Sequence, residues 1–256
     1  MTDLFSLKGK VAIITGGSRG IGKGISRALS AAGSDIVIAA RDQVKMEQAA
    51  RELKEEFGVQ VFCVHVDVQQ ESQIKAMVQK VRDTFKRIDI LVNNAGMNIR
   101  KMPQDYLAAE WDEILEVNLR SAFLCSKAVY PAMKEAGGGK IISIGSMASI
   151  FGGTRLAPYG ASKGGIVQLS RSLAVAWAPD NIQVNTILPG YINTDLVQRA
   201  IKSFSGLHEH VIGRTPVGRL GEPSDLAGAA IFLASSASDF ITGIALPVDG
   251  GFSIII

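Results

Sequence analysis

Tyr159 and Lys163 are the residues whose types and spacing most plainly suggest chemistry. They lie four positions apart, at what we predict to be the start of a helix, so their side chains share one face. A cationic ammonium beside a phenol favours the phenolate and lowers its pKa from about 10. Such a phenol can donate or accept a proton near neutral pH. Because a Tyr-x-x-x-Lys pair is common by chance, its meaning depends on the rest of the chain.

A glycine-rich turn follows the first predicted strand, 10–15. Its glycines, Gly16, Gly20 and Gly22, stand where a helix begins, and they let the backbone approach a pyrophosphate at the positive helix N-terminus. The spacing is Gly-x-x-x-Gly-x-Gly and differs from the commoner Gly-x-Gly-x-x-Gly fingerprint. The alternative is a tight turn that needs glycine for positive φ.

The end of the second predicted strand, 35–40, decides which dinucleotide would bind. A carboxylate there would bind a ribose 2′-hydroxyl, whereas an arginine would accommodate a 2′-phosphate. Arg41 stands at this position, and Arg19 lies in the glycine-rich turn, so two guanidinium groups can converge on a phosphate. We therefore favour NADP(H), with NAD(H) possible because Asp42 is adjacent. Taken singly, each arginine is more simply explained as a solvated surface residue, and only the two together favour the phosphate.

Further polar residues follow later strands. Asp67 closes the third strand and could accept a hydrogen bond from an adenine amino group, or it could cap the next helix. Asn93-Asn94-Ala95-Gly96 ends the fourth strand with small and amide residues suited to a cofactor, or to a turn. Asn118 lies inside a predicted helix, where asparagine is unfavourable and needs an explanation. Ser146 follows the fifth strand and can meet Tyr159 at one strand end, although a serine there also suits a cap.

The elements that position these residues alternate between strand and helix without a linker. Strands are expected at about 10–15, 35–40, 59–66, 88–92, 140–144, 183–188 and 243–248. Between them lie helices at about 43–57, 70–86 and 104–136, and one from Tyr159 to about Ala178. This pattern predicts an α/β, Rossmann-type, doubly wound parallel seven-stranded sheet with helices on both faces. We expect one domain over 1–256, with the irregular stretch 191–221 as a substrate lid.

Composition excludes several classes of function. The 27 basic and 24 acidic residues leave a net charge of +3 without long runs of one sign, so neither nucleic acid nor a membrane surface is expected as a partner. No apolar run is long enough for a membrane span, and the N-terminus lacks a secretory signal pattern, so a cytoplasmic location is expected. Cys63 and Cys125 suit buried positions, and the three scattered histidines indicate no metal site.

Taken together and in order, the motifs resemble those of the short-chain dehydrogenase/reductase family, in its single-domain branch. The resemblance covers the chain from the first strand to Val248-Asp249-Gly250-Gly251. Its motifs are Thr-Gly-x-x-x-Gly-Ile-Gly at 15–22, Asn-Asn-Ala-Gly at 93–96, Asn118, Ser146, Tyr159-x-x-x-Lys163 and Pro189-Gly190.

The resemblance implies a role for each matching residue. Tyr159 would be the general acid/base, Lys163 would lower its pKa and bind the nicotinamide ribose, and Ser146 would hold the substrate oxygen. Asn118 would position a water near Lys163, and Asn93 would line the cofactor. The remaining implied cofactor-binding residues are Gly16, Ser18, Arg19, Gly20, Ile21, Gly22, Arg41, Asp67, Val68, Asn94, Ala95, Gly96, Tyr159, Lys163, Pro189, Gly190, Ile192 and Thr194.

The expected activity is NADP(H)-dependent interconversion of a secondary alcohol and a ketone. Basic and polar residues at 97–101, 152–155 and in the lid, with Arg199, Lys202, His208, His210 and Arg214, favour an anionic, hydroxyl-rich substrate. The 96–101 and 145–149 stretches are similar to the gluconate 5-dehydrogenase and deoxygluconate dehydrogenase branch, which implies a sugar acid or polyol such as gluconate/5-ketogluconate. The alternatives are a 3-oxoacyl thioester reductase and a non-catalytic dinucleotide-binding protein.

The family also implies assembly into a homotetramer through two long helices and the last strand. The small residues Gly160, Ala161, Gly164 and Gly165 would permit close helix approach. Phe252 with Ile254-Ile255-Ile256 forms an apolar tail that a monomer would expose, unless it packs within its own chain.

Overall fold

The structure is a computed structural model that describes residues 4–255. Its strands form one sheet in the order β3-β2-β1-β4-β5-β6-β7, and every neighbouring pair is parallel. The predicted doubly wound, seven-stranded α/β fold is therefore confirmed. The strands are β1 (Val11–Thr15), β2 (Asp35–Ala40), β3 (Val61–His65), β4 (Ile90–Asn93), β5 (Gly139–Ile144), β6 (Ile182–Pro189) and β7 (Ala245–Val248).

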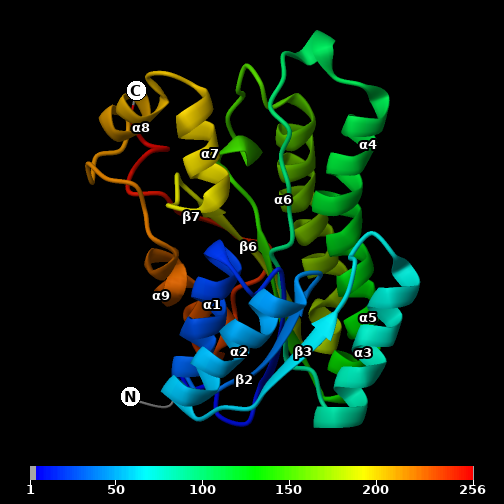
Figure 1. Ribbon diagram of the computed structural model, residues 1–256. Coiled ribbons are helices and arrows are strands. Elements are labelled where there is room, and N and C mark those ends of the chain that lie inside the picture. The colour runs from blue at the N-terminus through cyan, green and yellow to red at the C-terminus, as the bar shows by residue number, and fades with distance from the viewer. Residues whose placement is uncertain (1–3, 256) are drawn as a thin grey trace.

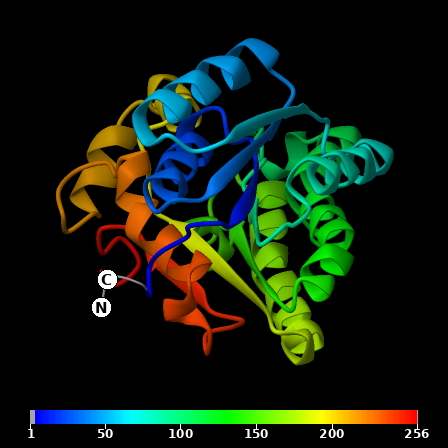
Figure 2. The same ribbon diagram turned by 90° about the horizontal axis from the view of Figure 1, so that it is seen from below.

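Helices cover both faces of the sheet (Figures 1 and 2). One face carries α1, α2 and α9, and the other carries α3, α5 and α6. The helices are α1 (Gly20–Ala31), α2 (Gln43–Phe57), α3 (Glu71–Phe85), α4 (Ala108–Leu115), α5 (Ser121–Glu135), α6 (Ala157–Trp177), α7 (Asp195–Ser203), α8 (Leu207–Gly213) and α9 (Ala227–Ala234). Short turns of helix are η1 (Pro103–Asp105), η2 (Glu116–Arg120), η3 (Met147–Ser149), η4 (Ala178–Asp180), η5 (Pro223–Leu226) and η6 (Ser236–Ser238).

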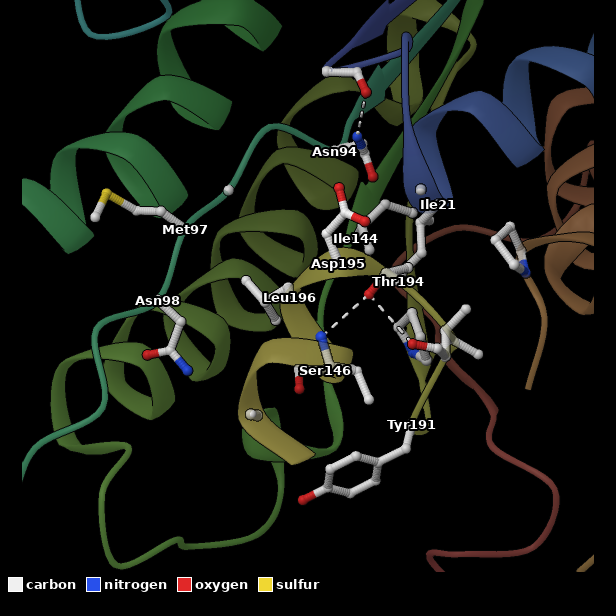
Figure 3. A pocket seen from close by; sticks show the side chains of 18 of the residues that line it. Ile21, Asn94, Met97, Asn98, Ile144, Ser146, Tyr191, Thr194, Asp195 and Leu196 are labelled. Carbon is white, nitrogen blue, oxygen red and sulfur yellow. Dashed lines mark hydrogen bonds between the residues drawn. The ribbon is translucent and has the colours of Figure 1, made fainter. Parts of the chain in front are cut away.

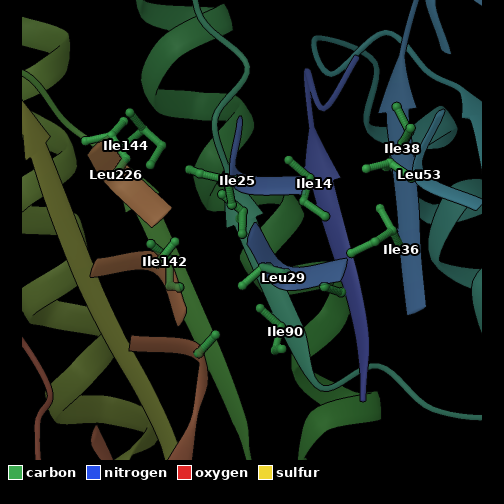
Figure 4. Close-up of a cluster of buried hydrophobic side chains, with 14 of the residues drawn as sticks. Ile14, Ile25, Leu29, Ile36, Ile38, Leu53, Ile90, Ile142, Ile144 and Leu226 are labelled. Carbon is green, nitrogen blue, oxygen red and sulfur yellow. The ribbon is translucent and has the colours of Figure 1, made fainter. Parts of the chain in front are cut away.

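The central strand β1 is almost entirely apolar because both of its faces are covered. All five residues of β1 are buried, and Ile13 pairs with Val37 on one side and Leu91 on the other. Alternate residues of each strand then face opposite helix layers. Ile14 contributes to the layer shared with Ile25 of α1, which Figure 4 shows. Each such side chain contributes about 1.5–3 kcal/mol on burial.

Two predicted regions differ in detail. The helix expected at 104–136 is interrupted by η2, a turn of π-helix that carries Asn118, between α4 and α5. The stretch 191–221, expected to be irregular, contains α7 and α8. Both helices are short, nine residues in α7 and seven in α8, and Gly206 at φ 76° lies between them.

The chain reverses its direction of winding between β1 and β4. From β1 the sheet grows outward through β2 and β3 on one side, and through β4 to β7 on the other. The connections leave a crevice at the carboxyl ends of these two central strands. In Figure 1, α7 and α8 stand above that end of the sheet, so a ligand in the crevice would lie between the strand ends and these helices.

Candidate active site

A cavity of about 2190 Å³ opens at the carboxyl ends of the strands. It is larger than the roughly 300–1,000 Å³ of an ordinary small-molecule pocket. Its wall includes the turn after β1, the loops after β4 and β5, and α7 with α8. Figure 3 shows Asn98, Ser146 and Thr194, from three of these segments, around one hollow. The volume suits a dinucleotide together with a second molecule.

The glycine-rich turn is packed too closely for side chains. A Cβ on Gly22 would lie 2.2 Å from the Gly16 carbonyl oxygen, and one on Gly20 would lie 3.3 Å from Cγ2 of Thr194. Gly16 and Gly20 also have positive φ, at 67° and 50°. Helix α1 starts here without a side-chain cap and without an acidic residue in its first turn. Its positive end therefore faces the cavity without a neutralising carboxylate, as an anionic phosphate group requires.

Thr15 ties this turn to the end of β4. Its hydroxyl oxygen accepts hydrogen bonds from the backbone N–H groups of Asn94 and Ala95, both at 3.0 Å, and its O–H donates to the Val92 carbonyl at 3.3 Å. The Asn94 amide in turn donates to the Thr15 carbonyl at 2.8 Å and to the Gly16 carbonyl at 3.2 Å. The two central strand ends are therefore held together by one buried hydroxyl and one amide.

Arg19 and Arg41 lie on the cavity wall at the edge of this turn. Both are exposed, and neither forms a salt bridge among residues 4–255. The neighbouring Asp42 is occupied elsewhere, because its carboxylate caps α2 by accepting from Lys45 N at 3.1 Å and pairs with the Lys45 ammonium at 3.5 Å. The backbone hydrogen bond from Lys45 lowers the pKa of Asp42. The carboxylate therefore remains charged and committed to its helix.

Lys163 is buried, at 5% exposure, and its ammonium nitrogen donates to the Ile144 carbonyl at 2.7 Å. Burial lowers the pKa of Lys163 to about 8. Burial also raises the pKa of Tyr159, while the Ser146 hydroxyl and the charge of Arg100 act in the opposite direction. Lys163 is not among the groups that shift the Tyr159 pKa here, so its predicted effect on the phenol stays a prediction. The amine lies 5.8 Å from the centre of the Tyr159 ring and points its hydrogen bond at β5 instead.

Ser146 serves as a turn cap and also faces Tyr159. Its hydroxyl oxygen accepts from the Ala148 backbone N–H at 3.1 Å, at the start of η3. The same hydroxyl is close enough to Tyr159 to lower its pKa. The capping hydrogen bond fixes the rotamer of Ser146. The serine can therefore cap η3 and face Tyr159 at the same time.

Both the oxygen and the nitrogen of the Asn118 side-chain amide form hydrogen bonds within the chain. Its oxygen accepts from Met97 N at 2.8 Å, and its amide nitrogen donates to Met97 O at 2.9 Å and to Ser162 Oγ at 3.0 Å. It is 2% exposed and does not reach the cavity wall. These contacts explain an asparagine in a helical segment, because the amide joins the loop after β4 to α6.

The cavity wall contains most of the predicted site residues. They come from seven segments of the chain: Gly16, Ser18, Arg19, Gly20, Ile21, Arg41, Asp67, Val68, Asn94, Ala95, Gly96, Ser146, Tyr159, Lys163, Pro189, Gly190, Ile192 and Thr194. Gly22 lies behind the turn, packed against Gly16. Asn93 points away, with its amide donating to Ser126 Oγ at 3.0 Å on α5. Asn93, Gly22 and Asn118 therefore do not line the cavity, and contacts within the fold explain their positions instead.

Sequence reasoning missed three contributors to the site. Thr15 is the hydrogen-bonding centre of the turn, and its place between a buried strand and the first glycine was the available signal. Tyr191 and Phe151 also lie on the cavity wall. Nothing in their local sequence distinguishes them from core aromatics.

The small residues of α6 pack within the chain. A Cβ on Gly165 would lie 2.8 Å from Cδ2 of Leu119, and one on Gly160 would lie 3.6 Å from the Ala148 carbonyl. Phe252 is 7% exposed and packs against Tyr191 and Phe151. For Gly165 and Phe252 these contacts agree with the alternative of packing within the chain, and the association surface stays a prediction. Ile254 and Ile255 are exposed, and Ile256 lies outside the described residues.

Within residues 4–255, no cluster of three or more His, Cys, Asp or Glu side chains is arranged to hold a metal ion. None of the described helices combines the length and apolar character needed to cross a membrane.

Comparison with known proteins gives matches along nearly the whole chain. Residues 16–253 match the sequence model of the family described as enoyl-(acyl carrier protein) reductase. The 5-keto-D-gluconate 5-reductase of Escherichia coli is 39% identical over 256 residues, all of both chains. The 2-dehydro-3-deoxy-D-gluconate 5-dehydrogenase of Pseudoalteromonas atlantica is 40% identical over 98% of this chain and 99% of its own.

The same holds for solved structures. The crystal structure of a gluconate 5-dehydrogenase from Burkholderia cenocepacia, in complex with NADP and tartrate, superimposes with a TM-score of 0.95 at 39% identity. The match covers all of this chain and 99% of that one. With its parallel sheet, glycine-rich turn and Ser-Tyr-Lys group, this chain belongs to the short-chain dehydrogenase/reductase family.

Proposed function

We propose that the protein is an NADP(H)-dependent oxidoreductase that interconverts a ketone and a secondary alcohol on a sugar acid, such as 5-ketogluconate and gluconate. The observation that carries the proposal is that one cavity contains the phosphate-binding turn, the Ser146, Tyr159 and Lys163 side chains, and the basic residues of the lid. Cofactor, proton donor and an anionic substrate can therefore meet there.

The residues present fit NADP(H). The uncapped start of α1 and the close glycine packing suit a pyrophosphate, and the unpaired guanidinium groups of Arg19 and Arg41 suit a 2′-phosphate. Asp67 and Val68 would contact the adenine, and Thr194, at the start of α7, would contact the nicotinamide end. The bound dinucleotide supplies or accepts the hydride.

The protein would supply the proton and hold the reacting oxygen. The raised pKa keeps the Tyr159 phenol protonated at neutral pH, so it is ready to donate to the oxygen of a ketone. The Ser146 hydroxyl, fixed by its cap, would donate a hydrogen bond to the same oxygen as charge develops. Lys163 would bind the nicotinamide ribose and, with a pKa of about 8, exchange protons with Tyr159 near neutral pH. We assign Asn118 a positioning role, because it holds the Met97 loop against α6.

The class of substrate is supported by charge and by the relatives. Arg100, Arg155, Arg199, His210 and Arg214 all lie on the wall, so an anionic substrate is favoured over a neutral one. The relatives described above are named for gluconate-type substrates. A sugar acid combines this negative charge with hydroxyl groups that the polar wall can bind.

A panel of carbonyl compounds tests the proposal. NADPH oxidation is followed with 5-ketogluconate, a 3-oxoacyl thioester and a simple cyclic ketone, and each assay is repeated with NADH. The proposal expects 5-ketogluconate with NADPH to give the highest kcat/KM. A preference for the thioester would assign the protein to acyl reduction instead. Tight NADPH binding without turnover of any compound would identify a binding protein.

We propose further that 1–256 form one domain, in which 191–221 act as the substrate lid, and that the protein works as a cytoplasmic homotetramer. The free thiols of Cys63 and Cys125 support a reducing compartment. Exposed apolar side chains, among them Trp111, Phe123 and Ile254, support association. Light scattering at several protein concentrations measures the mass directly, and a monomer mass at every concentration would refute the assembly.

A further inference from the structure

Two arginine–ring contacts join the lid to the rest of the cavity wall. The Arg155 guanidinium, from the loop before α6, lies 5.0 Å from the ring centre of Phe204 at the end of α7. Arg214, at the end of α8, lies 5.4 Å from the ring centre of Phe151 and 4.8 Å from that of Phe252. All five side chains line the cavity. The two arginines therefore have fixed surroundings within the site.

Among the described cations of the cavity wall, Arg214 is the one with a buried side-chain N–H group that lacks an acceptor; like Arg155 and Arg199, it also has no acidic partner there. Arg219, five residues further along, forms a bidentate pair with Asp225, at 2.6 and 3.0 Å. Lys101 pairs with Glu110. In the part of the chain that the structure describes, the Arg214 side chain has neither a salt bridge nor a hydrogen bond, and its Nε is buried without an acceptor. A buried N–H group of an unpaired cation destabilises the folded protein unless an anion accepts a hydrogen bond from it.

The two rings leave Arg214 suited to one kind of ligand. The Phe151 and Phe252 rings stand at 69° to one another, with centres 6.5 Å apart, and form an apolar corner around the guanidinium. Ring contacts stabilise the cation but accept no conventional hydrogen bond from its N–H groups. The N–H groups remain available in a planar arrangement that matches the two oxygens of a carboxylate.

The corner adjoins the reacting centre. Phe252 packs against the Tyr191 ring at 5.5 Å, and Tyr191 is close enough to Tyr159 to influence its ionisation. Phe151 follows η3, whose cap is Ser146. Arg214, Ser146 and Tyr159 all line this cavity, together with the rings of Phe151, Phe252 and Tyr191. A sugar acid that carries its ketone near one end and its carboxylate at the other spans such an arrangement.

We propose that Arg214 is a specificity-determining residue that binds the carboxylate of the substrate from the lid, within the corner formed by Phe151 and Phe252. This inference rests on the proposed function, because it assigns the acid group of the sugar acid to a particular side chain. Arg214 binds the carboxylate equally in the ground state and in the transition state. Its loss therefore raises KM for the acid and leaves kcat nearly unchanged.

The test compares an acid with its neutral counterpart. Arg214→Met keeps the length of the side chain without its charge, and Arg214→Lys keeps the charge without the planar donor pair. For each variant, kcat/KM is measured with 5-ketogluconate and with the ketohexose that carries a hydroxymethyl group in place of the carboxylate. We expect the acid-to-neutral ratio to fall about 100-fold in Arg214→Met, as the loss of a charged hydrogen-bonded pair implies. Arg214→Lys should recover part of the ratio.

Lys202→Met is the matched control, because Lys202 is a cation of the lid that does not line the cavity. Its ratio should equal that of the wild type. A folding defect in Arg214→Met would lower both rates together, so the ratio isolates recognition from stability. Equal losses with acid and neutral substrates, or an unchanged ratio, would overturn the assignment.

A binding measurement separates this inference from the proposed function. Calorimetry gives the affinity of gluconate for the enzyme–NADPH complex in the wild type and in Arg214→Met. If the wild type reduces no sugar acid yet binds gluconate through Arg214, the proposed function fails and the carboxylate site stands. If it reduces 5-ketogluconate and Arg214→Met binds gluconate equally well, only the carboxylate site fails. Absence of both turnover and gluconate binding overturns both.

Discussion

The ammonium nitrogen of Lys163 donates a hydrogen bond to the carbonyl oxygen of Ile144 at 2.7 Å, from a side chain that is 5% exposed. A cation is thus buried against the end of β5 without a carboxylate partner among residues 4–255. Burial lowers its pKa from 10.5 to about 8. At neutral pH the protein is therefore less stable than it would be with an uncharged side chain at position 163. This cost indicates that Lys163 is present for function.

Replacing Lys163 by Met should stabilise the protein while removing its activity. The depressed pKa corresponds to a burial cost of roughly 3 kcal/mol, which the variant no longer has. Loss of the hydrogen bond to Ile144 destabilises the variant by about 1 kcal/mol, so we expect its free energy of unfolding to rise by about 2 kcal/mol at pH 7. Urea unfolding measures it.

The gain in stability of Lys163→Met should become smaller as the pH rises. Between about 8 and 10.5 the folded wild type holds fewer protons than the unfolded chain, so its stability rises with pH in this interval. The advantage of Lys163→Met should therefore shrink across it. A variant that is less stable than the wild type at pH 7 would show that the ammonium is better solvated than its burial indicates.

Thr15→Val should damage both stability and cofactor binding. Valine has a similar shape, but it leaves the backbone N–H groups of Asn94 and Ala95 without their acceptor. We expect a loss of about 2 kcal/mol in urea unfolding, with a raised Kd for NADPH. Thr84→Val is the control, because the Thr84 hydroxyl bonds only to its own exposed helix at Lys80. Wild-type NADPH affinity in Thr15→Val would show that the turn keeps its shape without the hydroxyl.

Arg41→Asp should shift coenzyme preference toward NAD(H). The new carboxylate would repel a 2′-phosphate and accept a hydrogen bond from a 2′-hydroxyl, while Asp42 continues to cap α2. The ratio of kcat/KM with NADPH to that with NADH should fall roughly 10- to 100-fold. Arg51→Asp, on the exposed side of α2, supplies the same change of charge away from the cavity. If both variants keep the wild-type ratio, Arg41 is a solvated surface residue.

Ser146→Ala should lower the rate and move its pH dependence. Losing a donor to the developing oxyanion reduces kcat by about 100-fold. Because the Ser146 hydroxyl lowers the pKa of Tyr159, its removal raises that pKa further. Reduction requires the protonated phenol, so the fall in rate at alkaline pH should begin at a higher pH in the variant. A pH–rate profile that shifts downward would contradict the position given to Ser146.

The fold and the outline of the site could be predicted because they depend on local patterns. Unbroken apolar runs such as 11–14 require burial on both faces, and the turn from β1 to α1 requires Gly16 and Gly20 at positive φ. Family, fold and the expected relation to gluconate dehydrogenases are confirmed by the comparisons.

What could not be predicted depends on pairs of residues far apart in the chain. The partners of Asn118 are Met97 and Ser162, and no local pattern reveals that its amide is fully used. The pKa of Tyr159 depends on burial by several segments, which outweighs the opposing effects of the Ser146 hydroxyl and the Arg100 charge. The basic residues of the lid look alike in sequence, and only the packing separates Arg214, with its two rings, from Lys202 on the outside.

The most direct test of the central claim is the activity of Tyr159→Phe with 5-ketogluconate and NADPH. The variant retains the ring and loses only the hydroxyl that would donate the proton, so kcat should fall about 1,000-fold or more while the Kd for NADPH changes little. Tyr130→Phe, whose hydroxyl bonds Asp180 away from the cavity, should keep wild-type activity. Substantial turnover by Tyr159→Phe would contradict the assignment of Tyr159 as the proton donor.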